Sequence, residues 1–446
     1  MLHHLHLKNV GPAPEMRLDL GRRLNLITGD NGLGKSFLLD VAWWAMTRRW
    51  PHELNRRMTS GYTARPTDPT RPASIDFELT SKSGIVSYQS EYSPRDEAWT
   101  GKPGRPWNPE LVIYAHADGA FSVWDPARNY WKRRGNVDVQ ERLPGYVFTP
   151  SEVWDELKVD VDGRTTIVCN GLVRDWASWI REGGPLSRLM KNILSELSPD
   201  SGPEERLKPG PLVRISLEDS RDIPSLETAY GTCVPILHAS AGVRRVVALA
   251  YMLLWSWSEH VFAARRHGEQ LTSQVVMLID ELEAHLHPRW QRSILHPVLG
   301  LAKLLHKQAT IQLIAATHSP LVLASAEPDF DPEQDAWFDL DLERVKRRPQ
   351  VVLRKREFVR RGDASAWLTS EAFDLKEARS IPAERAISRA LDLTASANPS
   401  AKAVQKVDDQ LRAALGDTDR FWLRWSQFRD ALRNKRPARA TRRRAS

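Results

Sequence analysis

The stretch LNLITGDNGLGKSFLL, residues 24–39, decides the fold. Apolar residues run up to Gly29, and a second apolar segment follows Ser36. Between them, GDNGLGKS fills every position of the pattern G-x-x-x-x-G-K-[ST], in the order strand, tight loop and helix that the pattern requires. The sequence therefore predicts a loop that binds the phosphates of a nucleoside triphosphate.

The chemistry of the loop follows from its residue types. Its glycines permit positive φ values, so that backbone N–H groups can approach an anion closely. Lys35 is expected to reach the β- and γ-phosphates, and the Ser36 hydroxyl to bind Mg²⁺. A glycine-rich turn that binds nothing is the alternative, which the complete pattern disfavours. The predicted nucleotide-binding residues are Gly29, Asp30, Asn31, Gly32, Leu33, Gly34, Lys35 and Ser36.

Length and composition indicate a globular protein. The chain has 446 residues, enough for two or three domains or for one large domain with insertions. Hydrophobic residues make up 41% and charged residues 27% of it. We find no run of about 18 apolar residues and no signal peptide, and therefore expect no membrane span. Two cysteines, Cys169 and Cys233, favour a reducing cytoplasm over a disulfide framework.

The net charge of +8 is concentrated at the C-terminus. Residues 431–446 carry seven basic side chains and no acidic one, so the rest of the chain is close to neutral. This basic tail has almost no large apolar residue, and we expect it to be disordered. Two interpretations stay open for it: contact with nucleic acid or another acidic partner, and a solvated end without a ligand.

Hydrophobic periodicity gives a coarse order of elements. An antiparallel β layer is expected from hairpins around Ser83-Gly84 and Asp118-Gly119. Residues 172–197 are expected to be helical, and a strand is expected to begin at Leu212. The other expected elements are two strands before the phosphate loop, a helix at 37–50, a long apolar helix after Gly242, buried strands ending at Asp280 and Thr317, a charged hairpin at 335–361 and helices at 364–436.

A second candidate site element is the segment VVMLIDELEAHLHPRWQ, residues 275–291. Its apolar strand ends at Asp280-Glu281. An aspartate at the end of a buried strand beside a phosphate loop is placed to hold Mg²⁺ together with Ser36. The adjacent Glu281 is placed to orient and deprotonate the attacking water. Ordinary surface acids after a buried strand are the alternative interpretation.

Two further motifs belong to the same constellation. His318 ends the next buried strand, where it could hydrogen-bond the γ-phosphate and report its presence. Ser240 and Gly242 open the long apolar helix and offer a second phosphate-binding surface. Because the chain already has a complete phosphate loop, we infer that Ser240 completes a site in another subunit, with two chains enclosing two nucleotides in two-fold symmetry. An ordinary helix cap is the alternative.

In this order, the four motifs resemble those of ATP-binding-cassette (ABC) ATPase heads. The segment IDELEAHLHPRWQ is similar to the soluble, non-transporter branch, which includes overcoming-lysogenisation-defect (OLD) ATPases and the RecF and SMC heads. Many members of that branch are ATPases of bacterial antiphage defence systems, such as Septu, PARIS and retron-associated systems. The segments SAWLTSEAFDLKEARSIPAERAI and LGDTDRFWLRW resemble, less specifically, the C-terminal region of such ATPases.

The resemblance implies an α/β fold, a P-loop ABC-ATPase head with an antiparallel β layer, followed by a mainly helical C-terminal region. The head would cover residues 1–326 with a β-rich insertion at about 51–165. A hairpin and helical region would cover 327–430, and the basic tail 431–446.

The resemblance also implies the cofactors ATP and Mg²⁺ and specific roles. Lys35, Glu281 and His318 would be catalytic, and Ser36 and Asp280 would hold the metal. Ser240 and Gly242 would act on the γ-phosphate of a partner, and Glu283 with residues 284–288 would lie at the dimer seam. The segment SAGVRR, residues 240–245, lacks the Leu and Gln of the transporter signature. The glutamine loop has only Gln89 as a candidate.

Three functions come into question for these residues. The first is an ATP-driven dimeric switch of an antiphage defence system that senses a trigger and controls a separate effector, a nuclease or toxin. Residues 327–446 lack a convincing nuclease cluster, because Asp339 and Asp341 lie in an expected hairpin, so the toxic chemistry is expected in a partner.

The alternative is a RecF/SMC-like DNA-repair or DNA-clamp ATPase. Against it stand the near-neutral body and the absence of long coiled coils, although the basic run at 344–356 could bind phosphates. The Asp-Glu-Leu-Glu segment and the extra C-terminal region argue against a transporter subunit.

Overall fold

The computed structural model describes residues 1–81, 84–101, 107–134, 137–139, 142–161, 163–199, 202, 206–345, 348–396 and 398–434. The chain divides into two compact units, Met1–Ala364 and Ser365–Ser446. The basic tail from residue 435 onward lies outside the described residues.

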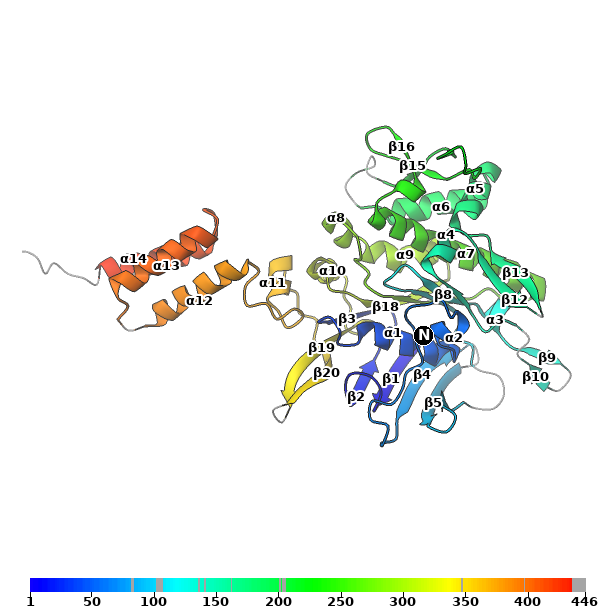
Figure 1. Ribbon diagram of the computed structural model, residues 1–446, viewed down its shortest axis with the longest axis horizontal. Helices are drawn as coiled ribbons and strands as arrows, with labels where there is room; N and C mark the ends of the chain where they lie inside the picture. Colours follow the sequence, from blue (N-terminus) through cyan, green and yellow to red (C-terminus); the bar gives the residue numbers. More distant parts are fainter. Residues whose placement is uncertain are drawn as a thin grey trace, which may run out of the picture. The chain divides into compact units, whose positions relative to one another are not determined.

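An eight-stranded sheet organises the first unit (Figure 1). Four of its strands run parallel, in the spatial order β7-β17-β18-β3, and their near-continuous apolar sequences are buried on both faces. β19 continues the sheet parallel to β3, and β20, β8 and β11 pair antiparallel with their neighbours. The strands are β11 (Tyr146–Phe148), β8 (Phe121–Trp124), β7 (Leu111–Ala115), β17 (Gln274–Ile279), β18 (Thr310–Ala316), β3 (Leu24–Gly29), β19 (Ala336–Val345) and β20 (Arg348–Arg356).

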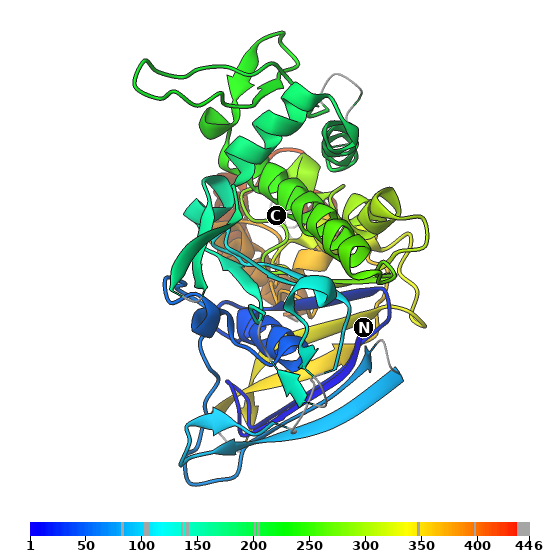
Figure 2. The same cartoon turned by 90° about the vertical axis from the view of Figure 1, so that its right-hand side faces the viewer.

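A second, antiparallel sheet has the order β2-β1-β4-β5-β6. Its strands are β2 (Glu15–Asp19), β1 (Leu2–Lys8), β4 (Ser74–Ser81), β5 (Gly84–Ser93) and β6 (Ala98–Trp99). Helix α1 (Lys35–Thr47) lies between the two sheets, as Figure 2 shows. Trp43 and Trp44 of α1 share one buried apolar cluster with Phe77 of β4 and Leu278 of β17. Both sheets therefore hold α1, which begins at the phosphate loop.

Helices cover the other face of the main sheet (Figure 1). The longest is α7 (Ala241–His267), which begins with Ser240 as its N-cap and ends at Gly268. Among the described residues it is the single helix long and apolar enough to cross a membrane, and 78% of that apolar window is buried in the protein, as in a core helix. Two helices, α5 (Leu172–Glu182) and α6 (Pro185–Glu196), contact α7. Of the others, α9 (Leu295–Leu305) contacts α6, and α10 (Pro320–Ala326) contacts α9 and α8 (Pro288–Gln291).

Short elements complete the first unit. They are α2 (Pro51–Leu54), α3 (Pro126–Asn129), α4 (Pro150–Trp154), the pair β9 (Lys132–Arg134) and β10 (Val137–Val139), the pair β12 (Leu157–Val161) and β13 (Arg164–Cys169), the small sheet β14 (Lys208–Pro209), β15 (Ser225–Glu227) and β16 (Cys233–Pro235), and η1 (Ile236–His238). The second unit holds α12 (Ile381–Ala395), α13 (Ala401–Ala414) and α14 (Phe421–Asn434), packed around Leu411 and Trp425. Helix α11 (Ala364–Leu368) begins at the boundary.

Three expectations differ from the structure. The charged hairpin, β19 and β20, belongs to the main sheet, so the first unit ends at Ala364 and not at residue 326. The hairpin at Asp118-Gly119 also belongs to the main sheet, because β7 pairs with β17. The strand expected from Leu212 is reduced to one isolated bridge between Val213 and Ile223. Leu217, in that segment, is fully exposed, so its apolar alternation has no surface to pack on.

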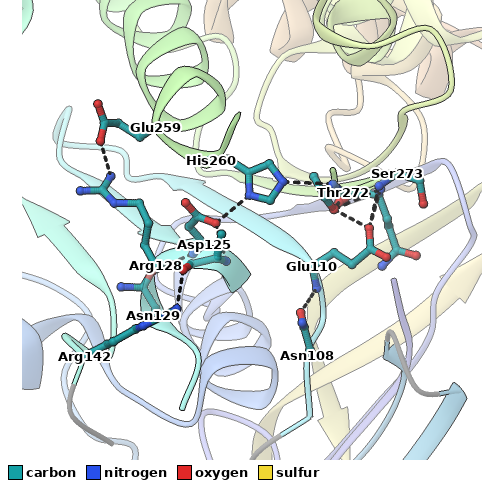
Figure 3. A network of polar contacts seen from close by, with 12 residues as sticks. Asn108, Glu110, Asp125, Arg128, Asn129, Arg142, Glu259, His260, Thr272 and Ser273 are labelled. Carbon is teal, nitrogen blue, oxygen red and sulfur yellow. Dashed lines mark hydrogen bonds and ion pairs between the residues drawn. The ribbon is translucent and has the colours of Figure 1, made fainter. Parts of the chain in front are cut away.

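A buried polar network fixes the start of β17 (Figure 3). The Nδ1 atom of His260 on α7 lies 2.8 Å from Asp125 Oδ1, and its Nε2 atom accepts the Thr272 backbone N–H at 3.0 Å. The Glu110 carboxylate accepts the backbone N–H groups of Ser273 and Gln274, each at 2.9 Å. These contacts fix the N-terminal end of β17, whose C-terminal end leads to Asp280.

Gln312 of β18 connects the two sheets, and its replacement by Leu tests this connection. The side chain is fully buried, accepts the Leu2 N–H at 2.7 Å, and donates to the carbonyls of Leu2 and Gly21 at 2.8 and 2.7 Å. Gln312→Leu removes the acceptor of the Leu2 N–H and one donor from each of the two carbonyls, although the Gly21 carbonyl keeps the Asn25 amide at 3.0 Å. The variant should lower the free energy of unfolding by about 2–4 kcal/mol. Urea unfolding followed by tryptophan fluorescence measures this. The exposed Gln308→Leu is the control, and equal stabilities of the two variants would contradict the prediction.

Candidate functional site

The carboxyl ends of the four parallel strands form one edge of the main sheet, and the predicted motifs gather there. β3 ends at Gly29, β17 at Ile279 and β18 at Ala316, directly before the phosphate loop, Asp280-Glu281 and Thr317-His318. In parallel α/β sheets, ligands bind outside the carboxyl ends of strands. The register of β3, β18 and β17 therefore assembles a site from segments far apart in the sequence.

The phosphate loop needs glycine because its backbone has positive φ values and because, at two positions, a Cβ atom would clash with neighbouring atoms. Gly29, Gly32 and Gly34 have φ values of +133°, +78° and +103°. A Cβ atom would lie 2.3 Å from the Leu340 carbonyl oxygen at Gly29 and 2.7 Å from Pro12 Cγ at Gly34. At Gly32 it would meet nothing within 4 Å, so this turn borders open space that phosphates could fill.

Lys35 and two carboxylates form the charged centre. The Lys35 ammonium donates to the carbonyls of Gly29 and Asp30 at 2.8 and 2.9 Å. Burial lowers the pKa of Lys35, which the nearby Asp280 and Glu281 raise in turn. Burial also raises the pKa of Asp280, and the neighbouring Ser36 hydroxyl lowers it.

The residues present fit a Mg²⁺ ion at this centre. The Asp280 carboxylate and the neighbouring Ser36 hydroxyl are hard oxygen ligands, the kind that Mg²⁺ prefers. A further carboxylate, Asp40, lies one turn along α1 and accepts the Tyr114 hydroxyl at 3.1 Å. Burial raises the pKa of Asp40 to about 7, and the neighbouring Asp280 adds to the rise. Burial raises the pKa of both carboxyl groups, and Asp280 raises that of Asp40 further, so a cation bound beside them would be favoured.

Glu281 is held in a strained conformation by Arg245 of α7. Glu281 has a φ of +51°, which is rare for a residue with a side chain. The Arg245 guanidinium donates to the carbonyls of Asp280 and Glu281 at 2.6 and 3.1 Å, and to those of His116 and Ala117 at 3.2 and 3.0 Å. One mostly buried arginine thus fixes the main chain directly after β17 and directly after β7. No sequence pattern singled out Arg245, although it follows the Ser-x-Gly segment closely.

Glu283 and His318 are linked within the chain. The Glu283 carboxylate accepts the Thr317 hydroxyl at 2.6 Å and the His318 backbone N–H at 2.5 Å. This contact fixes the backbone at His318, whose side chain is half-buried. Burial lowers the pKa of His318, and Lys35 lowers it further. Glu283 was expected at a dimer seam, and this contact gives it a positioning role within its own subunit.

Ser240 and Gly242 lie apart from the phosphate-loop contacts. Ser240 is exposed, and its hydroxyl accepts the Val243 N–H at 3.4 Å as the cap of α7. Among the described residues, no hydrogen bond joins Ser240 to the phosphate loop. A Cβ atom at Gly242 would lie 2.5 Å from the His285 carbonyl oxygen, so glycine permits α7 to approach residues 281–287.

Gln89 and Asp339 were two weaker candidates from the sequence, and neither lies among the motifs at the strand edge described above. Gln89 is exposed in the middle of β5, in the antiparallel sheet. In the main sheet, β7 pairs with β17 and leads to His116. His116 is buried, contacts Ser122 Oγ at 2.9 Å, and has its pKa lowered to about 4 by burial. Asp339 is also buried and bound by Thr28 at 2.9 Å and by Arg356 at 3.1 Å, so it connects β19 to its neighbours.

Replacing Arg245 tests its positioning role. Arg245→Met should reduce the rate of ATP hydrolysis by at least about tenfold, because the carbonyls that fix Glu281 lose their donor. ATP affinity should change less, because the phosphate loop is untouched. Arg245→Lys should recover little activity, since one ammonium cannot span four carbonyls. Arg265→Met, exposed on the same helix, is the control. Equal rates in Arg245→Met and the control would refute the role.

The raised pKa of Asp40 predicts a pH-dependent stability. Its pKa rises from 3.8 to about 7, so ionisation costs folding free energy between these pH values. Asp40→Asn keeps an acceptor for Tyr114 and removes this charge. The variant should therefore gain about 1–3 kcal/mol over the wild type at pH 8, and this gain should vanish below about pH 4. Urea unfolding across this pH range measures it, with the exposed Asp96→Asn as control. A difference independent of pH would contradict the assignment.

Solved structures with a similar arrangement include ATPase heads. The chain is similar to the SMC head domain from Thermotoga maritima, with 13% identity, a TM-score of 0.35, and coverage of 79% of this chain and 98% of that one. It is also similar to the recombination mediator protein RecF-ATPrS, with 13% identity, a TM-score of 0.36, and the same coverage. These scores are low, and the fold assignment rests on the strand order and register described above.

Two curated relatives match segments of the chain. The Retron Vc95 probable ATPase of Vibrio cholerae serotype O1 biovar El Tor is 46% identical over 113 residues, which is 25% of this chain and 20% of that protein. The Septu protein PtuA of Bacillus mycoides (strain KBAB4) is 32% identical over 84 residues, 19% of this chain and 10% of that protein. The match thus spans a fifth or less of each relative.

A family profile matches a much larger part of the chain. It covers residues 24–324, from the strand before the phosphate loop to the helix after His318. All the motifs at the strand edge lie within this range. Membership of this family indicates an ATPase. The chain belongs to the family described as "AAA domain, putative AbiEii toxin, Type IV TA system".

Proposed function

We propose that the protein is a Mg²⁺-dependent ATPase that acts as a dimeric switch in a bacterial antiphage defence system and controls a separate effector. The observation that carries the ATPase part is the convergence of the phosphate loop, Asp280, Glu281 and His318 at one edge of the sheet. The names of the two curated relatives, a retron ATPase and a Septu protein, support the defence part.

Each side chain has a role that its position supports. The phosphate loop, with its exposed Asp30 and Asn31, binds the triphosphate, and Lys35 turns from the loop carbonyls toward the β- and γ-phosphates. Ser36 and Asp280 would hold Mg²⁺, which when bound would neutralise charge on the phosphates. Glu281 takes a proton from the attacking water. His318, fixed by Glu283, contacts the γ-phosphate.

The site is completed by a second copy of the chain. Ser240 is exposed, caps a long helix, and makes no hydrogen bond to its own phosphate loop among the described residues. A helix N-terminus with an exposed hydroxyl suits an anion. In a two-fold dimer, each Ser240 and Gly242 would meet the γ-phosphate bound to the partner, so ATP would join the two copies. The dimer is the minimum assembly of the proposed switch.

The effector is expected to be a separate protein. Among the described residues, no group of three or more His, Cys, Asp or Glu side chains is placed to hold a metal as a nuclease would. Asp339, the best sequence candidate, is engaged in structural contacts. We therefore place the toxic chemistry, a nuclease or toxin, in a cytoplasmic partner whose activity the ATP-bound dimer controls.

Removing the proposed base should trap the bound nucleotide. Glu281→Gln should lower the rate of ATP hydrolysis by at least about 100-fold while ATP still binds. With ATP, this variant should sediment as a dimer, and without nucleotide as the wild type does. Glu269→Gln, an exposed residue after α7, is the control. Hydrolysis by Glu281→Gln at the wild-type rate would show that Glu281 is not the base.

Copurification from the native host tests the defence role. A tagged chain should bring down a nuclease or toxin, and the amount should differ between Glu281→Gln, which retains ATP, and Lys35→Ala, which should not bind it. Mass spectrometry of the bound material identifies the effector. Recovery of chromosomal DNA alone, without an effector, would favour a DNA-clamp ATPase.

A further inference from the structure

An apolar cavity lies beside the candidate site and shares Arg245 with it. Its volume is about 390 Å³, within the range of small-molecule pockets. It is enclosed by the start of α7, the turn between β7 and β8, α4, and residues 282–294. Its apolar lining includes Phe121, Trp154, Leu249, Ile279, Leu282 and Leu286.

The mouth of the cavity has an excess of available positive charge. Arg244 is exposed there, and no hydrogen bond or ion pair holds its side chain within the described parts of the chain. Two arginines, Arg244 and Arg245, and one acidic residue, Asp118, line the cavity, and the Asp118 carboxylate accepts the Ala120 N–H at 2.9 Å and the Thr59 hydroxyl at 3.2 Å. A ligand would therefore find an available cation beside an apolar wall.

The cavity shares a wall with the end of β17. Arg245 lines it and donates to the carbonyls of Asp280 and Glu281. Ile279 and Leu282, on either side of these two acids, also line it. A ligand that shifts α7 or this segment would move the Arg245 donors and, with them, the backbone that orients Glu281.

We propose that this cavity binds an anionic ligand with a bulky apolar or aromatic group, and that binding changes the rate of ATP hydrolysis through Arg245. The apolar group occupies the cavity, so that its own surface and the apolar lining of the cavity are both removed from water. The anion pairs with Arg244 at the mouth. The regulatory half rests on the proposed ATPase function, whereas the binding half does not.

The aromatic anion 1-anilinonaphthalene-8-sulfonate tests the binding half with the full chain. Wild type should bind it saturably, with enhanced fluorescence. Arg244→Glu should weaken binding by about tenfold or more, because one charge contact is lost and one repulsion is gained. Ser151→Trp, at the exposed mouth, should abolish binding by filling it. Arg266→Glu, exposed at the other end of α7, is the matched control and should bind as wild type does.

Equal binding by wild type, Arg244→Glu and Ser151→Trp would overturn the site. Competition then identifies the source of the ligand chemistry. Displacement of the probe by decanoate supports a lipid-derived acid, and displacement by an acetylated Trp-Glu peptide supports a protein ligand. Failure of both competitors would overturn the assigned ligand class.

The regulatory half has its own readout. Saturating probe should change the rate of ATP hydrolysis at least about twofold in wild type and leave Ser151→Trp unchanged. Binding without an effect on the rate would overturn the coupling and leave the binding site intact. If the wild type hydrolyses ATP but does not bind the probe, the proposed binding site is wrong. If the wild type binds the probe but hydrolyses no ATP, the proposed function is wrong.

Discussion

The parallel register of β3, β18 and β17 is the constraint on which the site depends. A parallel sheet places the carboxyl ends of its strands at one edge, so three loops from distant parts of the sequence meet there. The Ser36 hydroxyl in the first turn of α1 then neighbours the Asp280 carboxylate at the end of β17. Packing of α1 between two sheets fixes the position of that turn. The chemistry proposed for the site follows from this alignment.

Hydrogen bonds from side chains to main-chain groups hold the site in place. Arg245 fixes four carbonyl groups and supports the positive φ of Glu281, and Glu283 fixes the backbone at His318. Strain of this kind persists where surrounding contacts determine the conformation, and it concentrates at functional sites. Because Arg245 also belongs to the helix that Ser240 opens, a change at the end of α7 that we propose to face a partner can reach Glu281 over a short path. This link offers a physical route by which the occupancy of one nucleotide site could affect the other.

The sequence predicted the elements whose signals are local. The phosphate loop, the apolar strand before Asp280 and the strand before His318 each carry their own pattern, and all three lie where expected. Sheet membership was harder to predict, because pairing joins distant residues: the hairpin of β19 and β20 has a hairpin's sequence, but only the structure shows that β19 pairs with β3. The same holds for Arg245, whose importance arises from carbonyl groups that no sequence pattern marks. Gln89 was considered for its residue type alone, whereas β7 and His116 occupy the place beside β17.

Mixed-subunit complementation tests the central claim, that each site is completed by a second copy, most directly. Lys35→Ala should disable the phosphate loop and keep the α7 N-terminus, and Ser240→Arg should do the reverse. Each variant alone should hydrolyse ATP at no more than a few per cent of the wild-type rate. Because a mixed dimer contains one site with both intact parts, mixing the two variants should restore a large part of the activity. A mixture no more active than the sum of its two components would contradict the account.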